Sequence, residues 1–216
     1  MQQLTIPPLS EGEIYIGAIG DASGKTVLAA SIIESALSKG KRVIFTVPAI
    51  SLVDQTVREF WAEGIRDVGV IQASHPRTNY DMPVQIASLQ TMTRRGVPDC
   101  DLVIVDEANA YATATTRRWK SLAKIIQPHT FLWMMTGTPA SQSPADAYGL
   151  AKLVNPENVP LFYTGWRDSV MNKITLYKWA PKADARDRVF SALQPAIRFS
   201  KDQCLDLPPV MTLTRE

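Results

Sequence analysis

The chain has 216 residues, of which 45% are hydrophobic and 20% are charged, enough to bury the core of one domain or slightly more. A net charge of +2 permits a nucleic-acid partner without requiring one, because dedicated nucleic-acid-binding domains are usually more basic. The two cysteines, Cys100 and Cys204, lack metal-ligand spacing, so we expect two buried or half-buried thiols. The isolated His75 and His129 argue against a histidine metal site and are typical of surface loops.

No segment approaches the run of about 18 apolar residues that a membrane span needs. The first residues include Glu11 and Glu13 and lack the basic and apolar regions of a secretory signal. We therefore expect a soluble, cytoplasmic protein.

Short apolar runs alternate with helical patterns through the first two thirds of the chain. The runs are rich in Ile and Val and apolar on both faces, as buried parallel strands are, and span residues 14–19, 42–47, 68–71, 84–87, 102–105 and 131–135. Helical patterns occupy residues 26–39, a segment that begins at Ser51, and residues 116–126. This alternation predicts an α/β fold with a mainly parallel sheet and helices on both faces.

The alternation of apolar runs and helical patterns ends after Thr138-Pro139, where prolines become frequent. Residues 184–193 predict one more short helix, and the other residues predict helices and loops packed on the preceding lobe. Leu207-Pro208-Pro209 has the composition of a linker, and residues 210–213 could start a new strand.

The first chemistry-bearing motif is Gly20-Asp21-Ala22-Ser23-Gly24-Lys25-Thr26, placed between a predicted strand and a predicted helix. Backbone N–H groups at a helix N-terminus can hold phosphate oxygens, Lys25 can reach the β and γ phosphates, and the Thr26 hydroxyl can ligate Mg²⁺. Ile19 stands where the strict phosphate-loop pattern has its first glycine. Taken alone, the motif could also be a chance Gly-Lys-Thr in a turn.

The second motif is an apolar strand, residues 102–105, that ends in Asp106-Glu107-Ala108-Asn109. Ligands of open α/β sheets bind at the carboxyl ends of strands, so these carboxylates are expected beside the phosphate loop. Asp106 would hold Mg²⁺, and Glu107 would orient and deprotonate the attacking water. Because a surface Asp-Glu pair is common, the order of the two motifs carries more weight than either motif alone.

The third motif is the strand 131–135 followed by Thr136-Gly137-Thr138-Pro139. The small hydroxyl and glycine residues could hydrogen-bond toward the carboxylate strand and report the state of the γ-phosphate. An ordinary proline-terminated turn would have the same composition.

In this order, the three motifs resemble the first RecA-like lobe of superfamily 2 helicases. Residues 46–55 resemble motif Ia, residues 85–92 resemble the strand followed by S/T-x-Q, and residues 106–109 resemble the D-E-A-H or D-E-A-Q box with Asn in the last place. The resemblance implies a RecA-like P-loop NTPase fold that uses ATP and Mg²⁺. It also implies residues that couple hydrolysis to movement, namely Asn109, Thr136, Gly137 and Thr138. The nucleic-acid contacts that it implies are Pro48, Ser51, Gln55, Ser88, Gln90 and Thr91.

The C-terminal residues narrow the resemblance to the Swi/Snf-type branch. Residues 193–202 and then 205–209 look like its L-x-P-x-x-L-R-R-x-K…L-P-P bridge, with Phe199 replacing the second arginine. On this basis we expect a RecA-like lobe at 1–160, a helical or irregular part at 161–205, and a linker at 206–216 toward a second RecA-like lobe. The short extension before Lys25 departs from the family, which usually has an adenine-reading glutamine there, and would suit a bacteriophage-encoded enzyme.

The resemblance implies a motor lobe that couples ATP hydrolysis to movement on nucleic acid, with DNA as the expected partner and the nucleoid as the expected location. Because the second lobe of these enzymes supplies arginine fingers to the γ-phosphate, we expect a fragment that is weak or inactive as an ATPase by itself. Two alternatives stay open: a viral DNA-packaging, terminase-like ATPase, and a non-catalytic nucleotide-binding module derived from a helicase. A nucleotide kinase is disfavoured because the D-E-A-N and T-G-T-P segments have no role there.

Basic and aromatic side chains are further candidates for nucleic-acid contacts. The basic candidates are Arg58, Arg94, Arg95, Arg117 and Arg118, at least half of which we expect to be ordinary solvated surface. Among the five tryptophans, Trp133 is expected in the core because it lies within a buried strand.

Overall fold

The computed structural model describes residues 15–18, 24–72, 74–92, 94–95 and 97–198. Its centre is a seven-stranded sheet in the order β3-β4-β2-β5-β6-β1-β9, in which every neighbouring pair is parallel. The strands are β1 (Tyr15–Ala18), β2 (Val43–Val47), β3 (Val68–Ile71), β4 (Val84–Ser88), β5 (Leu102–Val105), β6 (Phe131–Met135) and β9 (Ala196–Arg198). The six predicted strands are therefore confirmed, and β9 is an addition.

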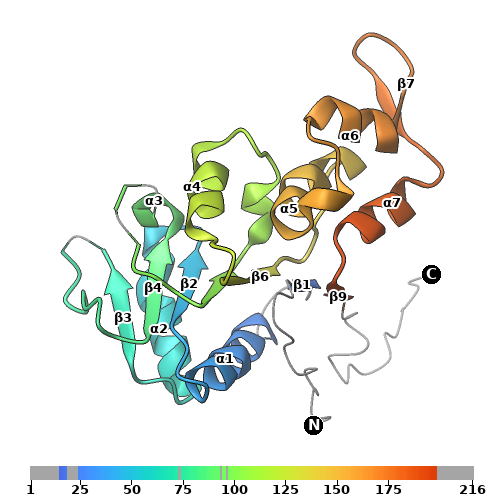
Figure 1. Cartoon of the computed structure of the whole chain (residues 1–216). Coiled ribbons are helices and arrows are strands. Elements are labelled where there is room, and N and C mark those ends of the chain that lie inside the picture. Colours follow the sequence, from blue (N-terminus) through green and yellow to red (C-terminus); the bar gives the residue numbers. More distant parts are fainter. Residues whose placement is uncertain (1–14, 19–23, 73, 93, 96, 199–216) are drawn as a thin grey trace, which may run out of the picture.

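Helices cover both faces of this sheet, as the alternating strand and helix patterns predict (Figure 1). Helices α1 (Gly24–Leu37) and α2 (Val53–Ala62) pack on one face with Phe45 and Ile104. Helices α4 (Arg117–Ile125) and α5 (Tyr148–Val154) pack on the other face with Ile44 and Val103. Adjacent residues of one strand thus enter different cores, which is why these strands are apolar at every position.

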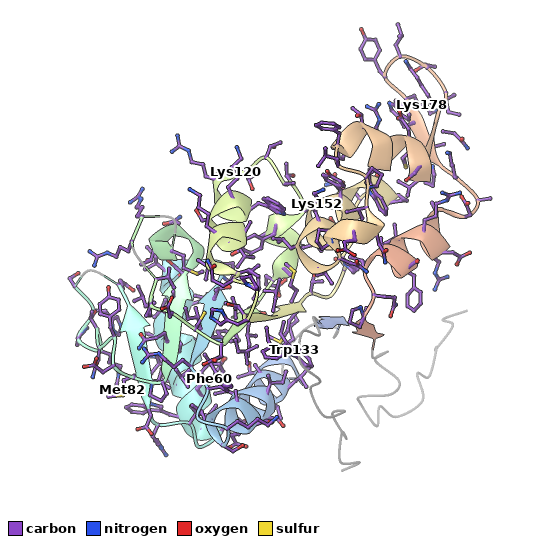
Figure 2. All side chains as sticks on the ribbon, viewed as in Figure 1. Phe60, Met82, Lys120, Trp133, Lys152 and Lys178 are labelled. Atoms are coloured by element: carbon purple, nitrogen blue, oxygen red, sulfur yellow. The ribbon has the colours of Figure 1, made fainter. Side chains whose placement is uncertain are left out.

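Large aromatic side chains fill the core between α1, α2 and the sheet. Phe60 and Trp133 are almost completely buried there, and Figure 2 shows both well inside the outline of the ribbon. The Phe45 and Phe60 rings meet edge-on with centroids 4.9 Å apart. The expectation that Trp133 belongs to the core is confirmed.

Local sequence explains where the predicted helices begin and end. Gly40 follows α1 with φ of +68°, the left-handed conformation that glycine adopts without strain. Thr116 caps α4, since its hydroxyl accepts a hydrogen bond from the backbone N–H of Trp119 at 3.3 Å. The short helix α3 (Leu89–Met92) directly follows β4.

The chain after β6 packs onto the lobe through α5, α6 (Tyr163–Val170) and α7 (Ala185–Ala192). Between α6 and α7 an antiparallel hairpin of β7 (Met171–Lys173) and β8 (Trp179–Pro181) projects from the body, and it includes the labelled Lys178 (Figures 1 and 2). The hairpin was not predicted, because residues 171–181 lack a clear polar and apolar alternation. The predicted helix at 184–193 is confirmed as α7.

The last described strand, β9, lies at the edge of the main sheet, beside β1. Ile16 pairs with Ala196 and Ala18 pairs with Arg198. The sequence predicted helical or irregular structure throughout residues 161–205, so this strand is a difference from that expectation. Residues 196–198 of the segment that resembles the Swi/Snf bridge therefore run next to β1.

Two further expectations have mixed outcomes. Cys100 is buried, and burial raises the pKa of its thiol to about 12, whereas Cys204 lies outside the described residues. His129 is exposed as expected, but the side chain of His75 is only 9% exposed. His75 Nε2 lies 3.0 Å from Asp54 Oδ1, so this histidine packs against α2 instead of standing free in solvent.

Within the part of the chain that the structure describes, no helix is both long and apolar enough to cross a membrane.

Candidate nucleotide-binding site

The described residues of the three chemistry-bearing motifs lie at one edge of the sheet. Strands β4, β2, β5, β6 and β1 are parallel neighbours, so their carboxyl ends lie side by side. The register pairs Val47 with Ser88 at the ends of β2 and β4. It pairs Gly17 with Met135 near the ends of β1 and β6. The described segments after β4, β2, β5 and β6 therefore follow one another along this edge.

Helix α1 begins within the predicted phosphate loop, at Gly24-Lys25-Thr26. The other predicted loop residues, Gly20, Asp21, Ala22 and Ser23, lie outside the described residues. Lys25 and Thr26 are half-buried in the first turn of α1, where free backbone N–H groups and the helix dipole favour anions. This position is the one that the sequence predicts for a phosphate-binding lysine and its neighbouring hydroxyl.

The loop lysine and the second carboxylate of the D-E-A-N segment are joined directly. Lys25 Nζ donates a hydrogen bond to Glu107 Oε1, although the two residues are 82 positions apart. Glu107 has φ of +50°, a left-handed conformation that is unfavourable for any residue with a side chain. Such backbone strain is often found at functional sites, and here it turns the chain sharply at the end of β5.

Asp106 is half-buried at the end of β5, and its backbone N–H donates to the Thr46 carbonyl of β2 at 3.0 Å. Burial raises the pKa of the Asp106 carboxyl above its ordinary value; the Lys25 ammonium opposes this shift and the Glu107 carboxylate adds to it. Asp106 Oδ1 is buried without a hydrogen-bond partner among the described residues. A buried, unsatisfied carboxylate oxygen suits Mg²⁺, which prefers hard oxygen ligands.

A third carboxylate, which the sequence analysis missed, belongs to the same site. Glu59 of α2 accepts a hydrogen bond from the Thr26 hydroxyl, with 3.2 Å between Oγ1 and Oε2. The charge of Glu59 also contributes to the raised pKa of Asp106. The spacing of Gln55 and Glu59, four residues apart on a predicted helix, could have indicated that they share a face.

The predicted coupling residues follow the ends of β5 and β6, which are neighbours in the sheet. Thr136 is fully buried, and its hydroxyl accepts a hydrogen bond from the Thr138 N–H at 3.3 Å. Gly137 and Thr138 are exposed, and so is Asn109, which lies in the 3₁₀ turn Ala108–Tyr111. The structure places these residues at the same edge as the carboxylates.

The two segments predicted to contact nucleic acid also lie together, at the ends of β2 and β4. Ser51, Gln55 and Gln90 are exposed and Pro48 is half-buried. Ser88 and Thr91 are buried instead, and their hydroxyls lie 3.0 Å apart. The Thr91 N–H also donates to Ser88 Oγ, so this pair stabilises the first turn of α3.

The basic candidates are all exposed, on α2, after α3 and at the start of α4. A hollow of about 360 Å³ lies between the segment after α3 and the end of α4, and Arg95, Cys100 and Lys124 help to line it. Among the predicted site residues that the structure describes, no other lines this hollow, so it is separate from the edge that bears the carboxylates.

Comparison with known proteins gives the family. The family model described as "Type III restriction enzyme, res subunit" matches residues 18–141, more than half of the chain. The chain belongs to this family. The match extends from the end of β1 to just beyond the T-G-T-P turn and so includes the phosphate loop, the D-E-A-N box and the segments between them.

The chain is also similar in sequence to a helicase and in fold to solved ATPase cores. The chain is 26% identical over 145 residues to "Uncharacterized ATP-dependent helicase YqhH" of Bacillus subtilis (strain 168), covering 62% of the chain but only 24% of that protein. Its fold is similar to the "SWI2/SNF2 ATPase core" of Sulfolobus solfataricus, solved alone and in complex with dsDNA. Both structures match with a TM-score of 0.69 and 16% identity, over 42% of their length and over 91% and 92% of this chain, respectively.

These findings confirm the predicted fold class and the resemblance to superfamily 2 helicases. This member of the family is a RecA-like lobe of the helicase type, and its family is one of helicase-type ATPase motor domains. The chain spans about a quarter of the helicase relative and less than half of the Sulfolobus structures.

Proposed function

We propose that this chain is the ATP-binding motor lobe of a DNA helicase or translocase. The observation that carries the proposal is the direct contact between Lys25 and Glu107, with Asp106 beside them, at the sheet edge that also bears the motif Ia segment. In a motor of this type, ATP hydrolysis and nucleic-acid contact must occur close enough to influence each other. Such an enzyme would act in the cytoplasm, at the nucleoid.

Each residue has a role that its position supports. Lys25 would bind the β and γ phosphates as a point charge, and Thr26 with Asp106 would hold Mg²⁺. The metal ion would neutralise phosphate charge during hydrolysis. Glu107, the more exposed partner of the ion pair, would orient the attacking water and accept its proton.

The nucleic-acid backbone would bind along the neighbouring ends of β2 and β4. Exposed polar groups of Ser51, Gln55 and Gln90 would make the contacts, whereas the buried pair Ser88 and Thr91 would fix the shape of the turn. Such contacts to phosphates carry no sequence information and suit a protein that moves along a strand. That a Sulfolobus structure with this fold was solved with dsDNA supports DNA as the partner.

Full activity would require a second RecA-like lobe, because an arginine finger contributes about 10³–10⁵ in rate. The test is ATP turnover by this chain and by the longest natural form of the protein, each measured without DNA and with single- or double-stranded DNA. We expect DNA-dependent hydrolysis by the longer form, and ATP binding with little turnover by residues 1–216. Absence of hydrolysis by the longer form with either DNA would refute the motor function and favour a non-catalytic module.

Nucleic-acid binding has its own test. DNA affinity of the chain should fall steeply as salt rises, because each neutralised phosphate releases counterions. Replacing Arg117 and Arg118 at the start of α4 by alanine would reduce the salt slope if they contact phosphates. An affinity independent of salt would contradict backbone contacts.

A further inference from the structure

Glu59 connects the nucleotide site to the helix that carries a predicted nucleic-acid contact. One carboxylate oxygen, Oε2, accepts from the Thr26 hydroxyl at 3.2 Å. The other oxygen, Oε1, accepts from Gln55 Nε2 at 2.8 Å, one turn earlier on α2. Glu59 is half-buried, whereas Gln55 is exposed, so this chain of hydrogen bonds runs from the interior of the site to the surface.

The contact with Thr26 has a chemical consequence for metal binding. A threonine hydroxyl that ligates Mg²⁺ must direct a lone pair to the metal ion, so its proton has to point to another acceptor. The Glu59 carboxylate accepts the hydrogen bond from this hydroxyl, and that hydrogen bond makes the Thr26 oxygen a better metal ligand. Hydrogen bonds that orient a ligand in this way typically change metal affinity 10–100-fold.

We propose that Glu59 is a positioning residue that orients Thr26 for Mg²⁺ and, through Gln55, links this ligand to the nucleic-acid contact of α2. The inference rests on the proposed function, since it assumes that Thr26 binds Mg²⁺ with ATP. When nucleic acid binds the Gln55 amide, the hydrogen bond from Gln55 Nε2 to Glu59 Oε1 is weakened. The position of the Glu59 carboxylate then changes, and so does its hydrogen bond with the Thr26 hydroxyl. By reciprocity, Mg-ATP bound at Thr26 changes the affinity for nucleic acid by the same factor.

The first measurement is the Mg²⁺ dependence of nucleotide binding by the whole chain, followed with a fluorescent ATP analogue. Glu59→Ala should raise the Mg²⁺ concentration for half-maximal binding about 10-fold or more, while nucleotide binding in EDTA stays within about twofold of wild type. Glu59→Gln keeps a neutral acceptor and should have a smaller effect. The matched control is Glu63→Ala, an exposed carboxylate just after α2, which should behave as wild type.

A double-mutant cycle tests whether Glu59 acts through Thr26. In a Thr26→Val background, Glu59→Ala should cause no further change in Mg²⁺ dependence, because the hydroxyl it orients is gone. Equal effects of Glu59→Ala in both backgrounds would overturn the positioning role. Circular dichroism verifies that each variant is folded. If Glu59→Ala does not fold, Glu59→Gln replaces it in the cycle, because glutamine preserves the shape of the side chain.

The link to nucleic acid has a separate readout, namely the ratio of nucleotide dissociation constants with and without double-stranded DNA. Gln55→Ala and Glu59→Ala should both bring this ratio toward one. If Glu59→Ala shifts Mg²⁺ dependence but leaves the ratio unchanged, the link through Gln55 is wrong. If the wild-type chain binds no nucleotide at any Mg²⁺ concentration, the proposed function itself fails. If the wild-type chain binds nucleotide normally and Glu59→Ala has no effect, only the inference about Glu59 fails.

Discussion

Lys25 and Glu107 form an ion pair across the site, in which the Lys25 side chain is 13% exposed and the Glu107 side chain is 40% exposed. The lysine comes from the first turn of α1, and the glutamate follows β5 in a left-handed conformation. In this arrangement the group expected to bind phosphate is neutralised by the group expected to activate water. A phosphate that takes Lys25 would therefore release Glu107, so binding of the substrate and freeing of the general base would occur together.

Replacing Lys25 by alanine should weaken Mg-ATP binding at least tenfold. Charge-assisted hydrogen bonds contribute about 1.5–3 kcal/mol, and Lys25 is the residue proposed to donate them to the β and γ phosphates. Displacement of a fluorescent ATP analogue measures the effect. Lys39→Ala, at an exposed position after the far end of α1, is the control. Wild-type affinity in the Lys25→Ala variant would refute the assignment of the phosphate loop.

Replacing Glu107 by glutamine should separate binding from hydrolysis. Glutamine cannot accept the proton of the attacking water, so turnover by the longest natural form in the presence of DNA should fall about 10²–10⁴-fold. Nucleotide affinity should be unchanged or higher, because Lys25 no longer has a competing carboxylate. Phosphate release and nucleotide binding are measured on the same preparation. A parallel loss of affinity and turnover would indicate that Glu107 acts in binding instead of catalysis.

Replacing Asp106 by asparagine should stabilise the fold at neutral pH while weakening Mg²⁺-dependent nucleotide binding. Burial raises the pKa of Asp106, so the folded state favours the protonated carboxyl. The contribution of the Asp106 carboxyl to the free energy of unfolding is therefore greatest below its ordinary pKa of 3.8. This contribution is lost as pH rises through the raised pKa that the carboxyl has in the folded state. Urea unfolding at pH 4.5 and pH 7.5 measures this. The gain from Asp106→Asn should be larger at pH 7.5, and a gain that was larger at pH 4.5 would contradict the argument.

Replacing Gly149 by alanine should destabilise the lobe by about 2–4 kcal/mol. A Cβ at this position would lie 2.2 Å from the carbonyl oxygens of Tyr111 and Ala112, and backbone atoms cannot easily move aside. The Gly149 N–H donates to the Ala112 carbonyl at 3.0 Å, which fixes α5 against the turn that follows Glu107. Urea unfolding gives the free-energy difference.

A matched control for Gly149→Ala is Gly165→Ala in α6. There the nearest atom to an added Cβ is the Pro160 side chain at 3.1 Å, and the position is exposed. Because alanine also favours the helix, the change should stay within about 1 kcal/mol. Equal losses in the two variants would show that the close approach at Gly149 is unimportant.

Much of the fold and the outline of the site could be predicted from sequence, because their signals are local. Buried strands are continuous apolar runs, helices such as α4 have a cap and a period, and Gly24-Lys25-Thr26 and Asp106-Glu107 stand directly at element ends. Parallel strands place these ends at one edge by geometry alone. For these features the chemical information and the structural context lie within a few residues of each other.

Only the tertiary structure decided which side chains meet. The Lys25–Glu107 pair, the Thr26–Glu59 hydrogen bond and the pairing of β9 with β1 join residues that are 82, 33 and about 180 positions apart. The burial of Ser88 and Thr91 likewise depends on how α3 packs. Nothing in a single sequence marks a contact of this kind, because any carboxylate on an amphipathic helix has the same local pattern. The helix crossing and the strand order decide which one reaches the phosphate loop.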